Sequence, residues 1–275
     1  MSWQYGGNVS TPLVRSVSSR QSVSNVGYEV LKPELPAQKK AMTMKLTRTL
    51  MALWLFGIAF GYVEAAVVVY LRTLLDPMRE RAFAAVEHDE VFPLLLPTQP
   101  LADYPRYALV AATELGRELA TLAMLAAIGL ALGDHPHRWL AGFLIAFGIW
   151  DIFYYVFLRV LLGWPASLWT WDILFLWPVP WVGPVVAPLI VSASMIAAGT
   201  ALLRREAQGR PICFHWLHWA AICGGGLIIV VAFCWDWRHI LDGGTPRGFH
   251  WPLFVGGETL GVAGFLSAAR RSRVQ

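Results

Sequence analysis

Charged residues interrupt the apolar segments of this sequence at spacings that place them on single helix faces. Glu114 and Glu118 are four residues apart, and Arg117 immediately precedes Glu118. Residues three and four apart lie on one side of a helix, so these three side chains are within reach of one another. Two carboxylates this close repel in an apolar environment unless a proton, a cation or an arginine offsets the repulsion. The trio therefore indicates acid–base or cation-binding chemistry.

Other apolar segments carry similar polar positions. Asp151, Tyr155 and Arg159 are each four residues apart and form one stripe on a helix. Gly61 precedes Glu64 by three residues, so a neighbouring helix can approach closely beside this carboxylate. Together with polar residues from later segments, the candidate site comprises Glu64, Glu114, Arg117, Glu118, Asp151, Tyr155, Arg159, Asp172, His250 and Glu258.

Acids outnumber bases among the candidates within the apolar segments, where five carboxylates face two arginines. A charged side chain at the centre of a membrane helix costs roughly 2.5–3.5 kcal/mol on insertion scales, so such residues are expected to face one another or a hydrated cavity. Structural ion pairs explain single residues but leave the excess of acid unexplained. We therefore predict a site for a cation or a small polar ligand. A divalent metal is one alternative, with ligands Glu64, Glu114, Glu118 and Asp151.

Three functions are open on this pattern. The first is a metal-dependent membrane enzyme, since carboxylates from several helices bind iron or manganese in helical bundles. The Glu-x-x-His pairs of such bundles do not occur in these apolar segments. The second is a small transporter coupled to protons or another cation. The third is a non-catalytic subunit, whose partners would be other membrane subunits.

The composition requires a lipid environment around these residues. The 275-residue chain is 56% hydrophobic and only 15% charged, with a mean hydropathy of +0.51. Soluble domains carry about 25% charged residues. The net charge of +4 does not predict nucleic-acid binding, because the basic residues stand at the ends of apolar segments. The bilayer is therefore the expected partner, and nucleic acid is not.

The predicted fold is all-α, a polytopic helical membrane protein with about six transmembrane helices. A hydrocarbon core of about 30 Å requires about 20 helical residues. The runs of this length are approximately 50–72, 107–132, 139–162, 181–203, 216–236 and 251–269. The segment 163–180 is rich in tryptophan and contains three prolines, so we expect it to be interfacial or re-entrant.

The remaining segments are expected to lie outside the membrane. Residues 1–44 form a tail, rich in serine and valine, that is disordered or results from the choice of start site, and 45–275 form a single membrane domain. The segment 73–106 forms the largest loop on the outer side. Within it, Asp76 and Pro77 are typical of the cap and first residue of a short helix.

The loop charges predict the orientation. Lysine and arginine dominate one set of segment ends, which the positive-inside rule assigns to the cytoplasmic side. Both termini are then cytoplasmic, in a multi-pass protein of the cell membrane. In this orientation Glu64, Glu114, Glu118 and Glu258 fall in the outer halves of their helices, and Asp151 falls near the middle. The site is therefore expected to face outward.

Overall fold

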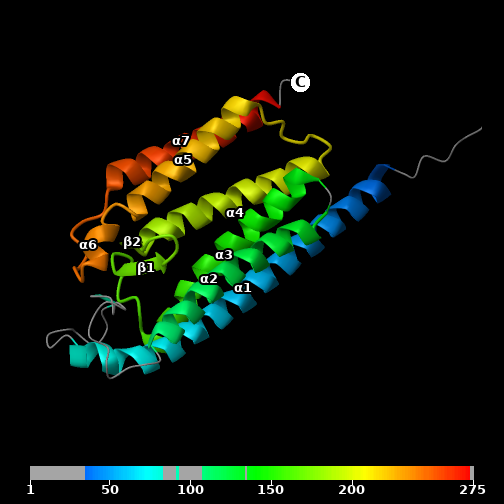
Figure 1. Ribbon diagram of the computed structural model, residues 1–275. Coiled ribbons are helices and arrows are strands. Elements are labelled where there is room, and N and C mark those ends of the chain that lie inside the picture. The colour runs from blue at the N-terminus through cyan, green and yellow to red at the C-terminus, as the bar shows by residue number, and fades with distance from the viewer. Residues whose placement is uncertain (1–34, 83–90, 93–106, 134, 273–275) are drawn as a thin grey trace, which may run out of the picture.

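The computed structural model describes residues 35–82, 91–92, 107–133 and 135–272, and these are mostly helical (Figure 1). Seven helices and two strands follow one another in this part of the chain: α1 (Leu35–Ala82), α2 (Tyr107–Ala131), α3 (Pro136–Leu162), β1 (Trp171–Phe175), β2 (Trp181–Pro184), α4 (Val186–Ala207), α5 (Trp216–Phe233), α6 (Trp237–Leu241) and α7 (Trp251–Arg271).

Five stretches of helix are long and apolar enough to cross a membrane: Lys39–Pro77, His137–Leu162, Val186–Ala207, Trp216–Leu241 and Trp251–Arg271. These stretches fit a multi-pass integral membrane protein. The expected sixth span corresponds to α2, whose 25 residues suffice in length. Three ionisable residues in α2 reduce its apolar character: Glu114, Arg117 and Glu118.

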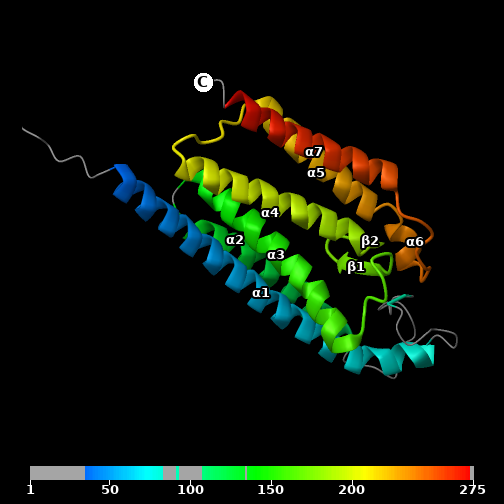
Figure 2. The ribbon, with the colours of Figure 1, turned by 180° about the vertical axis from the view of Figure 1, so that it is seen from behind.

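Helix α3 lies at the centre of the first four helices and packs against α1, α2 and α4. Helices α5 and α7 pack against each other, and α4 lies between this pair and the α1–α3 group (Figures 1 and 2). Close approach of α1 to α3 requires a glycine at position 61. A Cβ there would lie 2.9 Å from the backbone nitrogen of Tyr154. The expected close contact beside Glu64 is thus present.

The segment expected to be interfacial or re-entrant contains the first strand of an antiparallel β-hairpin. Strand β1 pairs with β2, and Asp172 stands opposite Gly183. Aromatic and branched side chains favour extended structure in β1, and pairing satisfies backbone groups that an irregular segment would leave open. The all-α expectation is wrong to this extent. The fourth helix also begins at Val186 rather than near 181, because Trp181–Pro184 is the second strand.

Helix α1 is longer than expected. It includes part of the predicted tail, 1–44, and part of the predicted outer loop, 73–106. It begins at Leu35, so residues 35–44 of the predicted tail are helical, while 1–34 lie outside the described residues. It also continues through Pro77 to Ala82, although a cap had been expected at Asp76. The Asp76 carboxylate forms an ion pair with Arg79, at 3.2 Å, within this helix rather than capping the start of a new one. Of the predicted loop, 83–90 and 93–106 lie outside the described residues.

Candidate functional site

A pocket of about 220 Å³ lies between α1, α2, α3 and the β-hairpin. Helix α1 contributes Glu64 and Arg72 to its wall, and β1 contributes Asp172. The other polar and aromatic residues of the wall are Glu114, Arg117, Glu118, Thr121, Trp150, Asp151, Tyr154, Tyr155, Trp164 and Phe175. The pocket is at the opposite end of the bundle from the start of α1 and the end of α7 (Figure 1).

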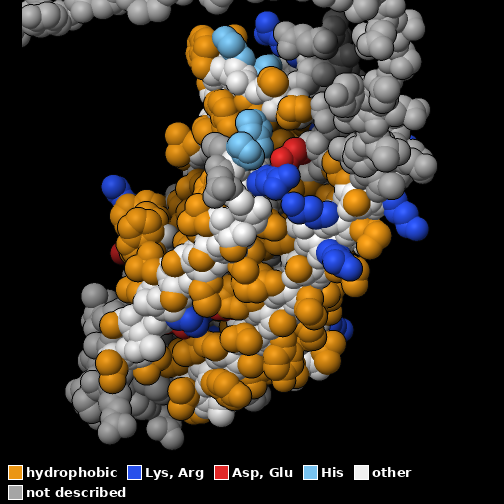
Figure 3. Space-filling view, turned by 90° about the vertical axis from the view of Figure 1, so that its right-hand side faces the viewer, with side chains coloured by type: hydrophobic (Ala, Val, Ile, Leu, Met, Phe, Trp, Pro, Cys, Tyr) orange, Lys and Arg blue, Asp and Glu red, His pale blue; other side chains and the backbone are white. Residues whose placement is uncertain are grey.

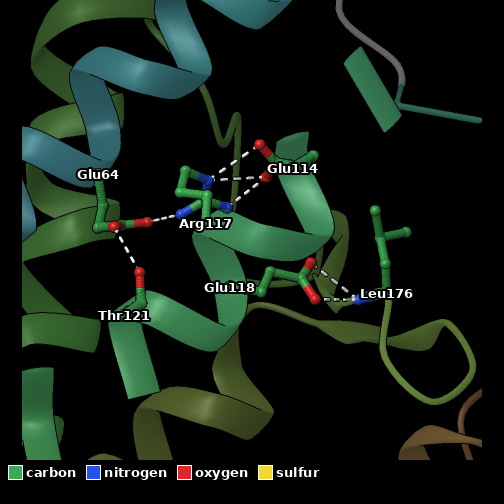
Figure 4. A network of polar contacts seen from close by, with 6 residues as sticks. All are labelled: Glu64, Glu114, Arg117, Glu118, Thr121 and Leu176. Atoms are coloured by element: carbon green, nitrogen blue, oxygen red, sulfur yellow. Dashed lines mark hydrogen bonds and ion pairs between the residues drawn. The ribbon is translucent and has the colours of Figure 1, made fainter. Parts of the chain in front are cut away.

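Arg117 joins two carboxylates from different helices. Its Nε donates to both oxygens of Glu114 at 2.9 Å, and its guanidinium also forms an ion pair with Glu64 of α1 (Figure 4). The Thr121 hydroxyl donates to Glu64 at 2.8 Å. The fork of donors on an arginine suits such paired carboxylates. This network connects α1 to α2 and neutralises one of its two acids.

Glu118 connects α2 to the hairpin. Its two carboxylate oxygens accept from the backbone N–H of Leu176 at 2.9 and 3.0 Å, as Figure 4 shows. Leu176 follows directly after β1, where the strand pairing ends. The carboxylate thus satisfies a backbone donor that the sheet leaves open. Among the described residues, no ion pair compensates its charge.

Two aspartates accept hydrogen bonds from neutral hydroxyls. Ser192 of α4 donates to Asp151 of α3, and Tyr155 of α3 donates to Asp172 of β1, both at 2.8 Å. Asp172 lies on the hairpin, outside the helical spans. Burial raises the pKa of Asp172 from 3.8 to about 6, although the hydrogen bond from Tyr155 acts in the opposite direction. A buried carboxylate in this position binds a proton or a cation readily near neutral pH.

The charges of the pocket remain unbalanced. Five carboxylates and two guanidinium groups line it, leaving three carboxylates in excess. Glu118, Asp151 and Asp172 are only 5–7% exposed, so bulk water cannot solvate their charges. Arg117 is occupied by Glu64 and Glu114. The arrangement can therefore offset its excess charge by taking up protons or by binding a cation.

Aromatic rings form a continuous part of the wall. Trp150 contacts Tyr154 at 6.4 Å between ring centroids, Tyr154 contacts Tyr155 at 5.0 Å, and Tyr155 contacts Trp164 at 6.4 Å. The Arg72 guanidinium lies 4.5 Å from the centroid of the Trp164 ring. A cation over an aromatic face is attracted by the ring quadrupole. One cation–π contact is thus already present in this wall.

Seven of the ten predicted site residues line this pocket, and three lie elsewhere. Arg159 donates to the carbonyl oxygens of Gly163 and Pro165 at the end of α3. His250 packs against Trp235 in a tilted arrangement, with 4.4 Å between ring centroids. Glu258 accepts from Ser194, which joins α7 to α4. Helical spacing places Arg159 on the same face as Asp151, and Glu258 on the same face as His250. Even so, none of these three candidates, Arg159, His250 and Glu258, lines the pocket.

Arg72 and Trp164 are pocket residues that the sequence reasoning did not include. A signal for Arg72 was present, because it follows Glu64 by eight residues, the same spacing that was recognised from Asp151 to Arg159. No spacing rule could have found Trp164, because it follows the end of α3 and reaches the pocket through the turn toward β1.

The predicted metal ligands all line the pocket, but they are not arranged as a coordination group. In the part of the chain that the structure describes, no group of three or more His, Cys, Asp or Glu side chains is placed to hold a metal ion. Glu64 and Glu114 bind Arg117, whereas Glu118 and Asp151 accept hydrogen bonds from separate donors. The donor set of a metal-dependent enzyme is therefore not assembled among these residues.

Comparison with family models, with curated proteins and with solved structures gives no match for this chain.

Proposed function

We propose that this integral membrane protein binds a small organic cation in the pocket beneath the β-hairpin. The observation that carries the proposal is the presence of three buried carboxylates, each from a different element, without an ion-pair partner among the described residues: Glu118, Asp151 and Asp172. A cationic ligand would offset these charges in a place where water cannot.

The walls favour an organic ammonium over a metal ion. A metal ion requires several oxygen or nitrogen donors that converge at short distance, and the described residues do not supply them. An ammonium group carried on an alkyl chain needs aromatic faces beside a carboxylate. Tyr154 and Tyr155 supply such faces beside Asp172. The volume of about 220 Å³ lies below the roughly 300–1,000 Å³ of drug-sized sites, which favours a ligand of few atoms.

The pocket would receive its ligand from outside the cell. Lysine and arginine gather at the opposite end of the bundle, which the positive-inside rule assigns to the cytoplasm. The site then lies near the outer surface, under a hairpin that connects two spans.

Cation transport in exchange for protons is a second candidate function, and Asp172 favours it. A group whose pKa is raised to about 6 is partly protonated near neutral pH, and binding of a cation beside it would release that proton. Coupling of this kind is the physical basis of proton-exchange transport. Proteoliposomes with an imposed pH gradient would test it, with accumulation of a labelled organic cation as the measurement.

Isothermal titration calorimetry on the detergent-purified full chain tests the binding function. The probes are tetramethylammonium, choline and butylammonium, with Mg²⁺ and Mn²⁺ as inorganic comparisons. We expect at least one organic cation to bind, and Glu118→Gln to weaken it about tenfold or more, because a hydrogen bond to a charged group contributes roughly 1.5–3 kcal/mol.

Glu258→Gln is the matched control, since it removes one intramembrane carboxylate outside the pocket. It should leave the affinity unchanged. Size-exclusion chromatography and a thermal transition establish that each variant is folded. Absence of binding by all three organic cations in folded wild-type protein would overturn the proposal, as would stoichiometric metal in the purified protein that is lost in Glu118→Gln.

A further inference from the structure

A second pocket, of about 180 Å³, lies at the other end of the bundle, where α1, α3 and α4 meet. Lys45 and Thr49 of α1, Arg138 of α3 and Glu206 of α4 form its polar wall. The apolar wall consists of Met42, Leu46, Leu132, Leu203 and Ala207. None of these residues lines the pocket beneath the hairpin, so the two sites are independent.

The charge of this second pocket is positive. Nε of Arg138 donates to Glu206 at 2.7 Å, so these two charges offset each other. Lys45 forms no ion pair with any residue that the structure describes, and its side chain remains available. A groove on the surface of α1 adjoins the pocket, shares Lys45 and Thr49 with it, and adds Lys40 and Arg48. An anion at this place would meet three or four cationic side chains and one carboxylate.

The whole end of the molecule around this second pocket is positively charged. Among the residues described there, one carboxylate, that of Glu206, accompanies ten basic side chains: Lys39, Lys40, Lys45, Arg48, Arg138, Arg204, Arg205, Arg210, Arg270 and Arg271. Figure 3 looks onto this end and shows lysine and arginine side chains gathered over it, with little acid between them. The positive electrostatic field of these side chains attracts the anionic headgroups of an adjacent membrane surface.

Apolar surface continues from the basic groove along α1. Met44, Arg48, Met51 and Leu55 follow one another at spacings of four, three and four, which places them on one face of the helix. Met51 and Leu55 are 66% and 71% exposed. A phosphate held by Lys45 and Arg48 would therefore stand at the head of a stripe suited to an acyl chain. Free inorganic phosphate would leave this stripe unused.

We propose that the pocket between α1, α3 and α4 binds the phosphate group of an anionic phospholipid. Lys45 contributes the uncompensated charge, Arg138 contributes donors from a second helix, and the acyl chain lies along Met51 and Leu55. The lipid connects α1 to α3 and α4, and it stabilises the folded chain because it binds the folded state preferentially.

Native mass spectrometry and thermal unfolding of the full chain in a neutral detergent test this proposal. The additions are short-chain phosphatidylglycerol, phosphatidylcholine of the same chain length, and inorganic phosphate. We expect phosphatidylglycerol to give a bound adduct and raise the unfolding temperature, with smaller effects from the other two. Lys45→Gln should weaken phosphatidylglycerol binding about fivefold, and Lys45→Arg should retain it.

Lys39→Gln is the matched control, because it removes the same charge from the same helix but lines neither the pocket nor the groove. It should retain most of the affinity. Equal stabilisation by phosphatidylcholine, or equal stabilisation by inorganic phosphate, would overturn the phospholipid assignment. Equal loss of binding in Lys39→Gln and Lys45→Gln would overturn the pocket as the site, since it would show a diffuse effect of charge.

Discussion

At the scale of single residues, the pocket beneath the hairpin contains carboxylates that are paired with an arginine and carboxylates that are not. Arg117 is shared between Glu64 and Glu114, whereas Glu118 and Asp172 accept from neutral donors. An ion pair away from water contributes little net stability, but removal of one partner is costly because it leaves an uncompensated charge. Substitutions that break the ion pairs should therefore lower stability, whereas substitutions of the carboxylates without an ion pair should weaken ligand binding.

Replacement of Arg117 tests the first of these expectations. Arg117→Met leaves Glu64 and Glu114 facing each other without a cation, and we expect it to lower the free energy of unfolding by about 3–5 kcal/mol. Unfolding by a denaturing detergent in mixed micelles measures the loss. The double variant Arg117→Met with Glu114→Gln should recover part of it. An unchanged unfolding free energy in Arg117→Met would show that the network is solvated.

Asp172 predicts a dependence of stability on pH. Its pKa is about 6 in the folded protein and 3.8 ordinarily, so the folded state binds more protons between these values. Stability contributed by this group is therefore present below about pH 4 and is lost as pH rises towards 6, by up to about 3 kcal/mol. We expect Asp172→Asn to remove this fall in unfolding free energy between pH 4.5 and 7. The exposed Asp242→Asn serves as the control. The same pH profile in wild type and Asp172→Asn would contradict the assignment.

At the scale of elements, glycine positions set how closely the helices pack. Helix α5 packs on α7 through glycines on both, and a Cβ at Gly225 would lie 2.5 Å from the carbonyl oxygen of Gly257. Its neighbour Gly226 has no atom within 4 Å of the corresponding position. The tight contact therefore depends on one residue of the Gly224–Gly226 run, and the α5–α7 pair forms because that residue faces α7.

This contrast gives a paired prediction. Gly225→Ala should destabilise the α5–α7 pair by roughly 1–3 kcal/mol, because backbone atoms rather than flexible side chains occupy the space. Gly226→Ala should be neutral or slightly stabilising, since alanine favours the helix by about 0.5–1 kcal/mol. Thermal unfolding of both variants in one detergent measures the difference. Equal transition temperatures for the two variants would contradict this packing.

At the scale of the whole molecule, the two ends of the bundle differ in charge. One end carries ten described lysine and arginine side chains, and the other carries the acidic pocket under the hairpin. The start of α1 and the end of α7 both lie at the basic end (Figure 1). In a cell membrane this asymmetry predicts a cytoplasmic basic end and an outward-facing pocket.

Cysteine accessibility tests this orientation. Cys213 is exposed between α4 and α5 at the basic end, and Ala166 is exposed between α3 and β1 at the other. In a chain with Cys223 and Cys234 replaced by serine, we expect Cys213 to react with a membrane-impermeant maleimide in inverted vesicles and not in intact cells. An Ala166→Cys, Cys213→Ser variant should react in intact cells. The reverse pattern would invert the orientation and place the pocket in the cytoplasm.

The positions of the long helices and seven of the pocket residues could be predicted from the sequence, because both depend on local rules. An apolar run must be helical to satisfy its backbone in lipid, and a spacing of three or four places side chains on one face. Glu114, Arg117 and Glu118 obey these rules within a single helix. Spacing does not reveal which faces meet. Arg159 and Glu258 therefore have suitable positions in the sequence but contact other partners.

Composition and spacing are enough to predict an apolar, helical chain with an excess of acid in its apolar segments. The other features depend on contacts between distant segments. The hairpin depends on pairing between Trp171–Phe175 and Trp181–Pro184, which is a contact between segments rather than a property of either one. The convergence of Arg72, Trp164 and Asp172 on one pocket depends on how α1, α3 and β1 pack. Which distant segments pack together depends on contacts over the whole chain, and a local sequence pattern does not contain that information.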